Sequence, residues 1–178
     1  MKRVILAACL AVALAGSSAQ AGSIGVGAFG GVSVPVVQSD VEQGPIFGVR
    51  VPIKLVPLLT IEPYYASSNL GDAQESVLGV TYTRQGFESK AYGANVMLTM
   101  GGPLQFYPFA GIGQTKLTRP GNELSLTTYN FGMGLGISPA PKISLHIRGE
   151  LAAAVDGETS RKFANATVGL SYALFSAP

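Results

Sequence analysis

Apolar and polar residues alternate along most of the chain, and the alternation is most regular in its last stretch, Arg161 to Phe175. One face of that stretch carries Ala164, Ala166, Val168, Leu170, Tyr172 and Leu174, and the other carries Asn165, Thr167, Gly169, Ser171 and Ala173. A period of two predicts a β-strand, because successive side chains of a strand point to opposite faces.

The same period predicts seven further strands upstream. We place them at residues 22–36, 45–54, 59–65, 91–100, 104–117, 124–137 and 142–155. Short turns are expected around Val56, at Gly101–Pro103 and at Ser138–Pro141, because proline and glycine gather there. Longer polar loops are expected at residues 35–44, 67–90, 118–123 and 156–160, the second with a short strand-like piece at residues 80–83.

The alternation is unusual for a soluble protein, because the large apolar residues share one face of each strand, and glycine and charged residues share the other face. In the strand at residues 124–137, for example, Tyr129, Phe131 and Met133 share one face while Gly132 and Gly134 share the other. An apolar outside and a polar inside are typical of a barrel in lipid. The pattern therefore predicts an all-β fold, an eight-stranded antiparallel up-and-down transmembrane β-barrel.

The first 21 residues have the order of parts of a secretory signal peptide: Lys2 and Arg3, an apolar run, and small residues ending at Ala21. We therefore predict a cleaved signal peptide at 1–21 and a single barrel domain at 22–178. Cys9 also suggests a lipoprotein processing site, but it comes too early in the apolar run for that to be the preferred interpretation. Without Lys2 and Arg3, the 12 basic residues fall to ten and equal the ten acidic ones. No basic patch indicates nucleic acid, and no cofactor is expected.

Four charged residues are expected to face the interior: Arg50, Glu62, Arg148 and Glu150. A turn centred on Val56 would set Arg50 opposite Glu62, and a buried charge needs such a partner. We interpret the four as a structural ionic network that fills the interior. Pro63 lies within the same predicted hairpin and is expected to cause a bulge or break there.

Aromatic residues on the predicted outer face fall at two heights. Phe47, Tyr65, Tyr92 and Tyr129 are expected near the loop ends of their strands, and Phe106 and Tyr172 near the turn ends. Two such rows are typical of the aromatic girdles at the two membrane interfaces.

The last strand also resembles the final strand of bacterial outer-membrane β-barrel proteins of the OmpA and OmpX type. Thr167, Gly169, Tyr172 and Leu174 match their polar-x-Gly-x-x-aromatic-x-hydrophobic assembly signal, although this chain continues past Phe175. The resemblance implies insertion in the outer membrane with periplasmic termini. It also implies contact with outer-membrane lipid and lipopolysaccharide, and with the barrel-assembly machinery during insertion. We expect no peptidoglycan-binding domain after Phe175.

The leading functional hypothesis is a non-enzymatic outer-membrane protein with a structural or surface-interaction role. Its binding regions would be the loops around Asp40, Asp72 to Lys90 and Asp156, whose ligand is unknown. The only histidine, His146, shares a strand face with Ser144 and Glu150, which suggests a hydrolase. Because outer-membrane lipid A deacylases resemble this fold, the resemblance implies a lipid A-modifying enzyme as the alternative. A span of roughly 20 Å at ~3.3 Å per residue keeps these three from forming a triad, so no catalytic residue is assigned. A soluble lipocalin-like barrel is less consistent with a glycine-lined and charged interior.

Overall fold

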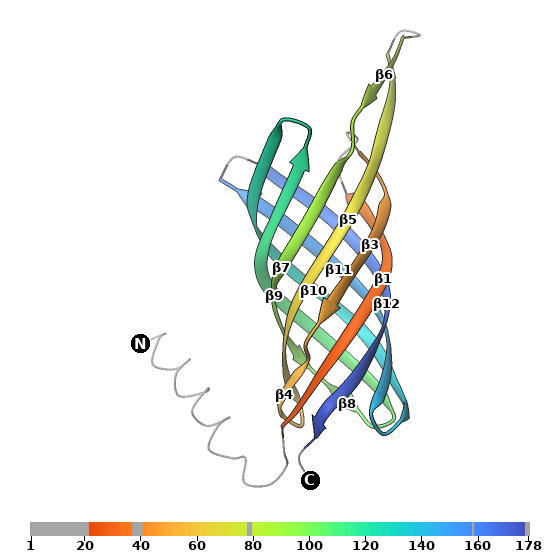
Figure 1. Cartoon of the computed structure of the whole chain (residues 1–178), viewed down its shortest axis with the longest axis vertical. Helices are drawn as coiled ribbons and strands as arrows, with labels where there is room; N and C mark the ends of the chain where they lie inside the picture. Colours follow the sequence, from red (N-terminus) through yellow and green to blue (C-terminus); the bar gives the residue numbers. More distant parts are fainter. Residues whose placement is uncertain (1–21, 37–40, 78–79, 158, 177–178) are drawn as a thin grey trace.

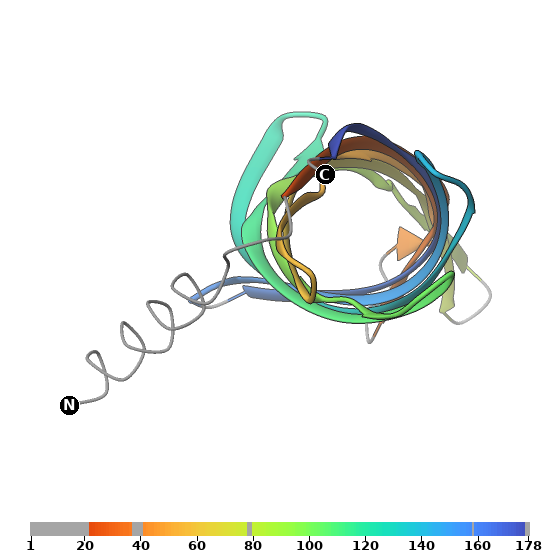
Figure 2. The same ribbon diagram turned by 90° about the horizontal axis from the view of Figure 1, so that it is seen from below.

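The computed structural model describes residues 22–36, 41–77, 80–157 and 159–176, which form one closed β-barrel (Figures 1 and 2). The predicted signal segment 1–21, the loop residue Asp40 and the last two residues lie outside this described part. No helix in the described ranges is long and apolar enough to cross a membrane.

Eight long strands make the ring, and each is antiparallel to both neighbours. The ring runs in the order β1 (Ser23–Val36), β3 (Gly44–Arg50), β5 (Leu59–Val77), β7 (Phe87–Leu98), β9 (Leu104–Arg119), β10 (Asn122–Ala140), β11 (Ile143–Asp156) and β12 (Thr159–Ser176). Pairing of β12 with β1 closes it. The predicted eight-stranded antiparallel barrel is therefore confirmed.

Four short strands extend this ring. They are β2 (Val41–Glu42), β4 (Ile53–Val56), β6 (Val80–Arg84) and β8 (Met100–Gly101). β4 continues β3 past a break and pairs with both β1 and β5, whereas β6 pairs with the far end of β5. The hairpin of β5 and β6 reaches well beyond the other loops at the upper end of the barrel in Figure 1. We call this upper end the loop end, and the opposite end, where β1 begins and β12 ends, the turn end.

The predicted facing of the strands is confirmed by burial. On β10 the outward residues Tyr129, Phe131 and Met133 are more than half exposed, whereas Asn130 between them is 3% exposed. On β9, Tyr107 is buried and Ile112 is exposed, so the odd-numbered positions, which include Gly111 and Gly113, face inward.

The outer face changes character partway along the barrel. Outward residues of β10 are apolar from Tyr129 to Ile137 and polar at Glu123, Ser125 and Thr127. A transmembrane strand needs about 9–11 residues, which the apolar part supplies. The remaining part of this 19-residue strand extends above the apolar band.

The predicted register of the β4–β5 hairpin is wrong by two residues. The turn lies at Pro57–Leu58, so Ile53 pairs with Ile61 and Arg50 pairs with Tyr64, not with Glu62. Moving the centre of a hairpin by one position shifts every pair by two residues. The predicted break at Pro63 is also misplaced, because β5 is continuous there and the interruption falls opposite it, at Val51–Pro52, where the amide of Val51 still donates to the Pro63 carbonyl.

The prediction of a loop at residues 67–90 is wrong for most of its length, which is strand. β5 continues to Val77 and pairs with β7 from Phe87 onward, while the predicted piece at residues 80–83 is confirmed as β6. Above the apolar band, the outward residues of these strands are polar because they face water instead of lipid. The composition of the segment therefore resembles that of a loop, although apolar and polar residues still alternate.

Candidate functional site

The centre of the barrel interior is an ion pair between β11 and β5. Arg148 donates from Nη1 to Glu62 Oε1 at 2.6 Å and from Nη2 to Oε2 at 2.8 Å. Both side chains are buried, with 7% and 2% of their surface exposed. Two parallel charge-assisted bonds in this geometry are strong and directional, so the pair crosslinks two strands that are not neighbours in the ring.

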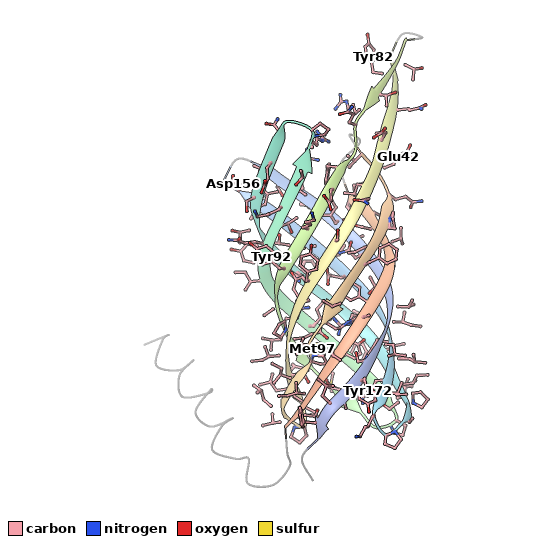
Figure 3. All side chains as sticks on the ribbon, viewed as in Figure 1. Glu42, Tyr82, Tyr92, Met97, Asp156 and Tyr172 are labelled. Carbon is pink, nitrogen blue, oxygen red and sulfur yellow. The ribbon has the colours of Figure 1, made fainter. Side chains whose placement is uncertain are left out.

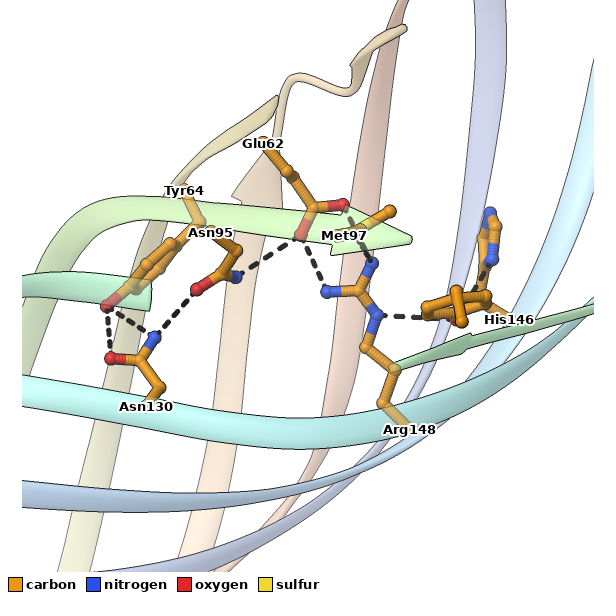
Figure 4. A network of polar contacts seen from close by, with 8 residues as sticks. Glu62, Tyr64, Asn95, Met97, Asn130, His146 and Arg148 are labelled. Atoms are coloured by element: carbon orange, nitrogen blue, oxygen red, sulfur yellow. Dashed lines mark hydrogen bonds and ion pairs between the residues drawn. The ribbon is translucent and has the colours of Figure 1, made fainter. Parts of the chain in front are cut away.

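A row of neutral polar groups extends from the ion pair across the lumen (Figure 4). Asn95 Nδ2 lies 3.5 Å from Glu62 Oε1, Asn130 Nδ2 donates to Asn95 Oδ1 at 2.9 Å, and it also contacts the Tyr64 hydroxyl at 3.0 Å. These groups come from β5, β7 and β10. They join strands on different sides of the ring in one hydrogen-bonded layer.

Aromatic side chains of β9 support the guanidinium of Arg148. Its Cζ lies 5.0 Å from the ring centroids of both Tyr107 and Phe109, and its Nε donates to the Tyr107 hydroxyl at 3.3 Å. The same hydroxyl lies 3.2 Å from His146 Nδ1. Such cation–π contacts gain strength when the charge is desolvated.

Glycines of β10 make room for these aromatic rings. Gly134 pairs with Tyr107 and Gly132 pairs with Phe109, and a Cβ at either position would collide with the ring opposite. In β10 the large neighbours for which the inward glycines leave space are therefore aromatic. The Gly-x-Gly spacing opposite Tyr107 and Phe109 is the sequence signal for this layer.

The predicted pairing of Arg50 with Glu62 is wrong, because Glu62 is held by Arg148. Arg50 instead stacks on the ring of Phe29, with Cζ 4.5 Å from its centroid, and its Nε and Nη1 have no hydrogen-bond partner among the residues that the structure describes. Glu150 accepts a hydrogen bond from Asn165 at 3.0 Å. The four predicted charges therefore all lie inside, but only two of them form an ion pair with each other.

Replacing Arg50 with methionine is expected to change the free energy of unfolding by no more than about 1 kcal/mol. The variant loses one cation–π contact, but it strands no carboxylate and it removes a buried guanidinium. Denaturant unfolding of the refolded barrel measures the difference. A loss as large as that expected for Arg148→Ala, about 3 to 5 kcal/mol, would mean that Arg50 has a direct carboxylate partner and that the register described above is incorrect.

His146, Ser144 and Glu150 point into the lumen but do not meet. His146 contacts Tyr107, Ser144 Oγ lies 3.0 Å from Ser138 Oγ, and Glu150 binds Asn165. Among the described residues, no three histidine, cysteine or acidic side chains are grouped closely enough to hold a metal ion. The arrangement offers hydrogen bonds that fix side chains, and it brings no nucleophile to a base.

The loop half of the lumen holds a buried apolar cluster, which the predicted interior of glycine and charge does not include. The cluster is made of Val41, Leu70, Phe87, Leu117, Leu126, Ala154 and Phe163. The rings of Phe87 and Phe163 meet edge to face at 6.4 Å, and Arg119 and Arg161 lie over Phe87. Apart from Val41, these residues continue the inward parity of their strands. Leu117, Leu126, Ala154 and Phe163 lie in predicted strands, whereas Leu70 and Phe87 lie in the segment predicted as a loop.

Two hollows lie on opposite sides of the Arg148–Glu62 pair, and both residues line each of them. The one toward the loop end has a volume of about 60 Å³ and also contacts Arg50 and Glu150. The one toward the turn end has about 240 Å³ and contacts Lys54 and Lys142. The ion pair thus separates the hollows, as expected for an eight-stranded barrel whose interior is filled by side chains.

The six girdle aromatics are all exposed on the outer face. Tyr65 pairs directly with Tyr92, and Tyr172 lies toward the opposite end of the barrel from Tyr92 (Figure 3). In the predicted assembly signal, Tyr172 and Leu174 face outward, whereas Thr167 and Gly169 face the lumen. Arg50 Nη2 would lie 2.6 Å from a Cβ at position 169, so this glycine makes room for the arginine.

Charges at the loop end are exposed and of both signs. Lys90 pairs with Glu88 at 3.0 Å, and Lys116 pairs with Glu123 at 2.9 Å. The hydrogen bond from Lys116 lowers the pKa of Glu123. Exposed pairs of this kind contribute little to stability, so we assign them to the solvated rim.

Comparison with known proteins identifies the fold. No family model and no curated protein sequence matches the chain. Solved structures do match: Neisserial surface protein A at a TM-score of 0.61 and 11% identity, with 85% of this chain and 96% of that chain covered. A major outer membrane protein of Thermus thermophilus matches at 0.58 and 11% identity, covering 86% and 99%. The N-terminal β-barrel domain of Pseudomonas aeruginosa OprF matches at 0.54 and 16%, covering 86% and 100%. The chain therefore has the fold of the small outer-membrane β-barrel proteins.

Proposed function

We propose that the chain is an integral protein of the bacterial outer membrane, with a structural or surface-interaction role and no catalytic activity. The observation that carries the proposal is the outer face of the barrel. It presents a continuous apolar band bounded by exposed tyrosines, while the charged side chains lie inside the barrel or beyond the band. Such a surface is stable in lipid and would aggregate in water.

The filled lumen argues for a role on the outside of the barrel. Arg148 and Glu62 cross its middle, and the packed cluster around Leu126 and Phe163 occupies its loop half. Such an interior leaves little room for a solute to pass through the barrel. The β5–β6 hairpin projects furthest, carries the exposed Tyr82 and is the segment best placed to meet a partner (Figures 1 and 3).

The proposed orientation puts both ends of the chain in the periplasm and the long hairpins at the cell surface. Contacts with lipopolysaccharide would then fall on the loop half, and the barrel-assembly machinery would engage β12 during insertion. Both partners are proposals that follow from the fold and from the outward Tyr172 and Leu174.

Cysteine labelling tests this orientation. Tyr82→Cys at the hairpin tip is expected to react with a membrane-impermeant maleimide on intact cells, whereas Gly102→Cys in the turn between β8 and β9 reacts only after the outer membrane is permeabilised. The two sites form a matched pair, because Tyr82 is exposed and a side chain at position 102 meets open space. Equal labelling of both on intact cells would overturn the proposal.

The absence of catalysis is tested through lipid A. Strains with and without the gene, and a strain carrying His146→Ala, are expected to give the same lipid A mass spectrum, because His146 faces the lumen and binds Tyr107. A change in acylation that requires the gene and is lost in His146→Ala would replace the proposal with a lipid-modifying enzyme.

A further inference from the structure

The hollow at the turn end of the barrel is lined by positively charged and hydroxyl side chains that neither the barrel fold nor the proposed membrane role requires. We call it the vestibule. Its volume is about 240 Å³, and its walls include Lys54, Lys142, Thr60, Thr99, Ser144 and Ser171. Ammonium and hydroxyl groups are hydrogen-bond donors that suit an anion.

The charge of the vestibule is not balanced by its walls. Within the described part of the chain, neither Lys54 nor Lys142 forms an ion pair with a carboxylate. Glu62 lies at the inner end, but Arg148 occupies both of its oxygens. The vestibule therefore has a neutral ion pair as its floor and two uncompensated positive charges nearer the opening, in contrast to the paired charges of the loop end.

The two lysines reach the vestibule from different sides. Lys54 lies on β4 and pairs with Ser23 of β1. Lys142 precedes β11, and its carbonyl accepts a hydrogen bond from the Ala173 amide of β12 at 2.8 Å. The lysines therefore flank the seam where β1 and β12 meet, and both also line the adjoining hollow beside Leu174 and Phe175.

We propose that the vestibule binds a phosphate group. A tetrahedral oxyanion has enough oxygens to accept from two ammonium groups and from wall hydroxyls at once, and charge-assisted bonds of this kind are the strong ones. The phosphate comes either from free phosphate in solution or from the head group of a phospholipid whose tails lie on the outer face. This site goes beyond the proposed role in the membrane, because free phosphate would bind to the barrel in any environment.

Titration of the full barrel in dodecyl maltoside micelles, which contain no phosphate, tests the site. Inorganic phosphate and dihexanoyl phosphatidic acid are the two probes, each followed by calorimetry and by broadening of its ³¹P resonance. Saturable binding of inorganic phosphate assigns a soluble source, and binding of phosphatidic acid alone assigns a lipid head group. Absence of saturable binding for both probes would overturn the proposal.

Charge variants locate the binding. Lys54→Gln with Lys142→Gln is expected to weaken binding by at least about tenfold, because the charge-assisted contacts are lost. The matched control is Lys90→Gln with Lys116→Gln, which removes the same charge at the loop end and should leave affinity unchanged. Thr99→Val keeps all charges and should weaken binding severalfold. Equal weakening in both double variants, with no effect of Thr99→Val, would mean diffuse attraction and not a site. A heat-dependent gel shift of each variant confirms that it is folded.

Discussion

Arg148→Ala is expected to lower the free energy of unfolding by about 3 to 5 kcal/mol, which is the cost of leaving a buried carboxylate without its partner. Within the described part of the chain, Glu62 would then retain only the long contact to Asn95 at 3.5 Å. The stabilising partner is 86 positions away along the chain, so the loss also removes a link across the lumen. The measurement is the fraction of compact barrel along a urea gradient in lipid vesicles.

A double variant provides the control for Arg148. Removing Glu62 together with Arg148 leaves no stranded charge, so the double variant is expected to be more stable than Arg148→Ala alone. If Arg148→Ala were as stable as the parent, or if the double variant lost the sum of both single effects, the pair would not be the central contact of the interior.

Phe163→Ala is expected to cost about 3 to 5 kcal/mol, the range for deleting a buried phenylalanine. Phe163 is 6% exposed and packs edge to face on Phe87, so the deletion leaves a cavity in the loop half of the lumen. The measurement is the same urea gradient in lipid vesicles.

Phe47→Ala is the matched control for Phe163, because Phe47 is 62% exposed on the outer face. Lipid chains can replace its contacts, so its removal should change stability by no more than about 1 kcal/mol. Equal losses for both variants would contradict the assignment of inside and outside.

The side of the barrel wall to which each strand residue points could be predicted from the sequence, because it depends only on whether the position in the strand is odd or even. Once Gly132 is inward, Asn130 and Gly134 must be inward as well, and the buried residues Leu126, Thr128 and Asn130 of β10 follow the same rule. The same parity identifies Leu70, Leu126 and Phe163 as inward. Leu126 and Phe163 lie within the predicted strands at 124–137 and 161–175, whereas Leu70 lies in the segment predicted as a loop because outward residues there, such as Asn69, are polar. Such polar residues only mark where the apolar band ends.

Register was harder to predict, since it depends on where each turn is centred. The turn at Pro57–Leu58 lies one position later than the predicted centre at Val56, and that difference moves Arg50 from Glu62 to Tyr64. The true partner of Glu62 lies on β11, across the lumen. No local pattern specifies such a contact, because strand tilt and the curvature of the closed ring determine which inward side chains meet.

Electrophoresis of the membrane fraction with and without boiling is the most direct test of the central claim, which is a closed barrel with its apolar face in lipid. The barrel is expected to remain in the membrane fraction, to migrate as a compact species when unheated, and to change mobility after boiling because its closed hydrogen-bonded ring then opens. Recovery in the soluble fraction without detergent, together with one mobility before and after boiling, would contradict the account.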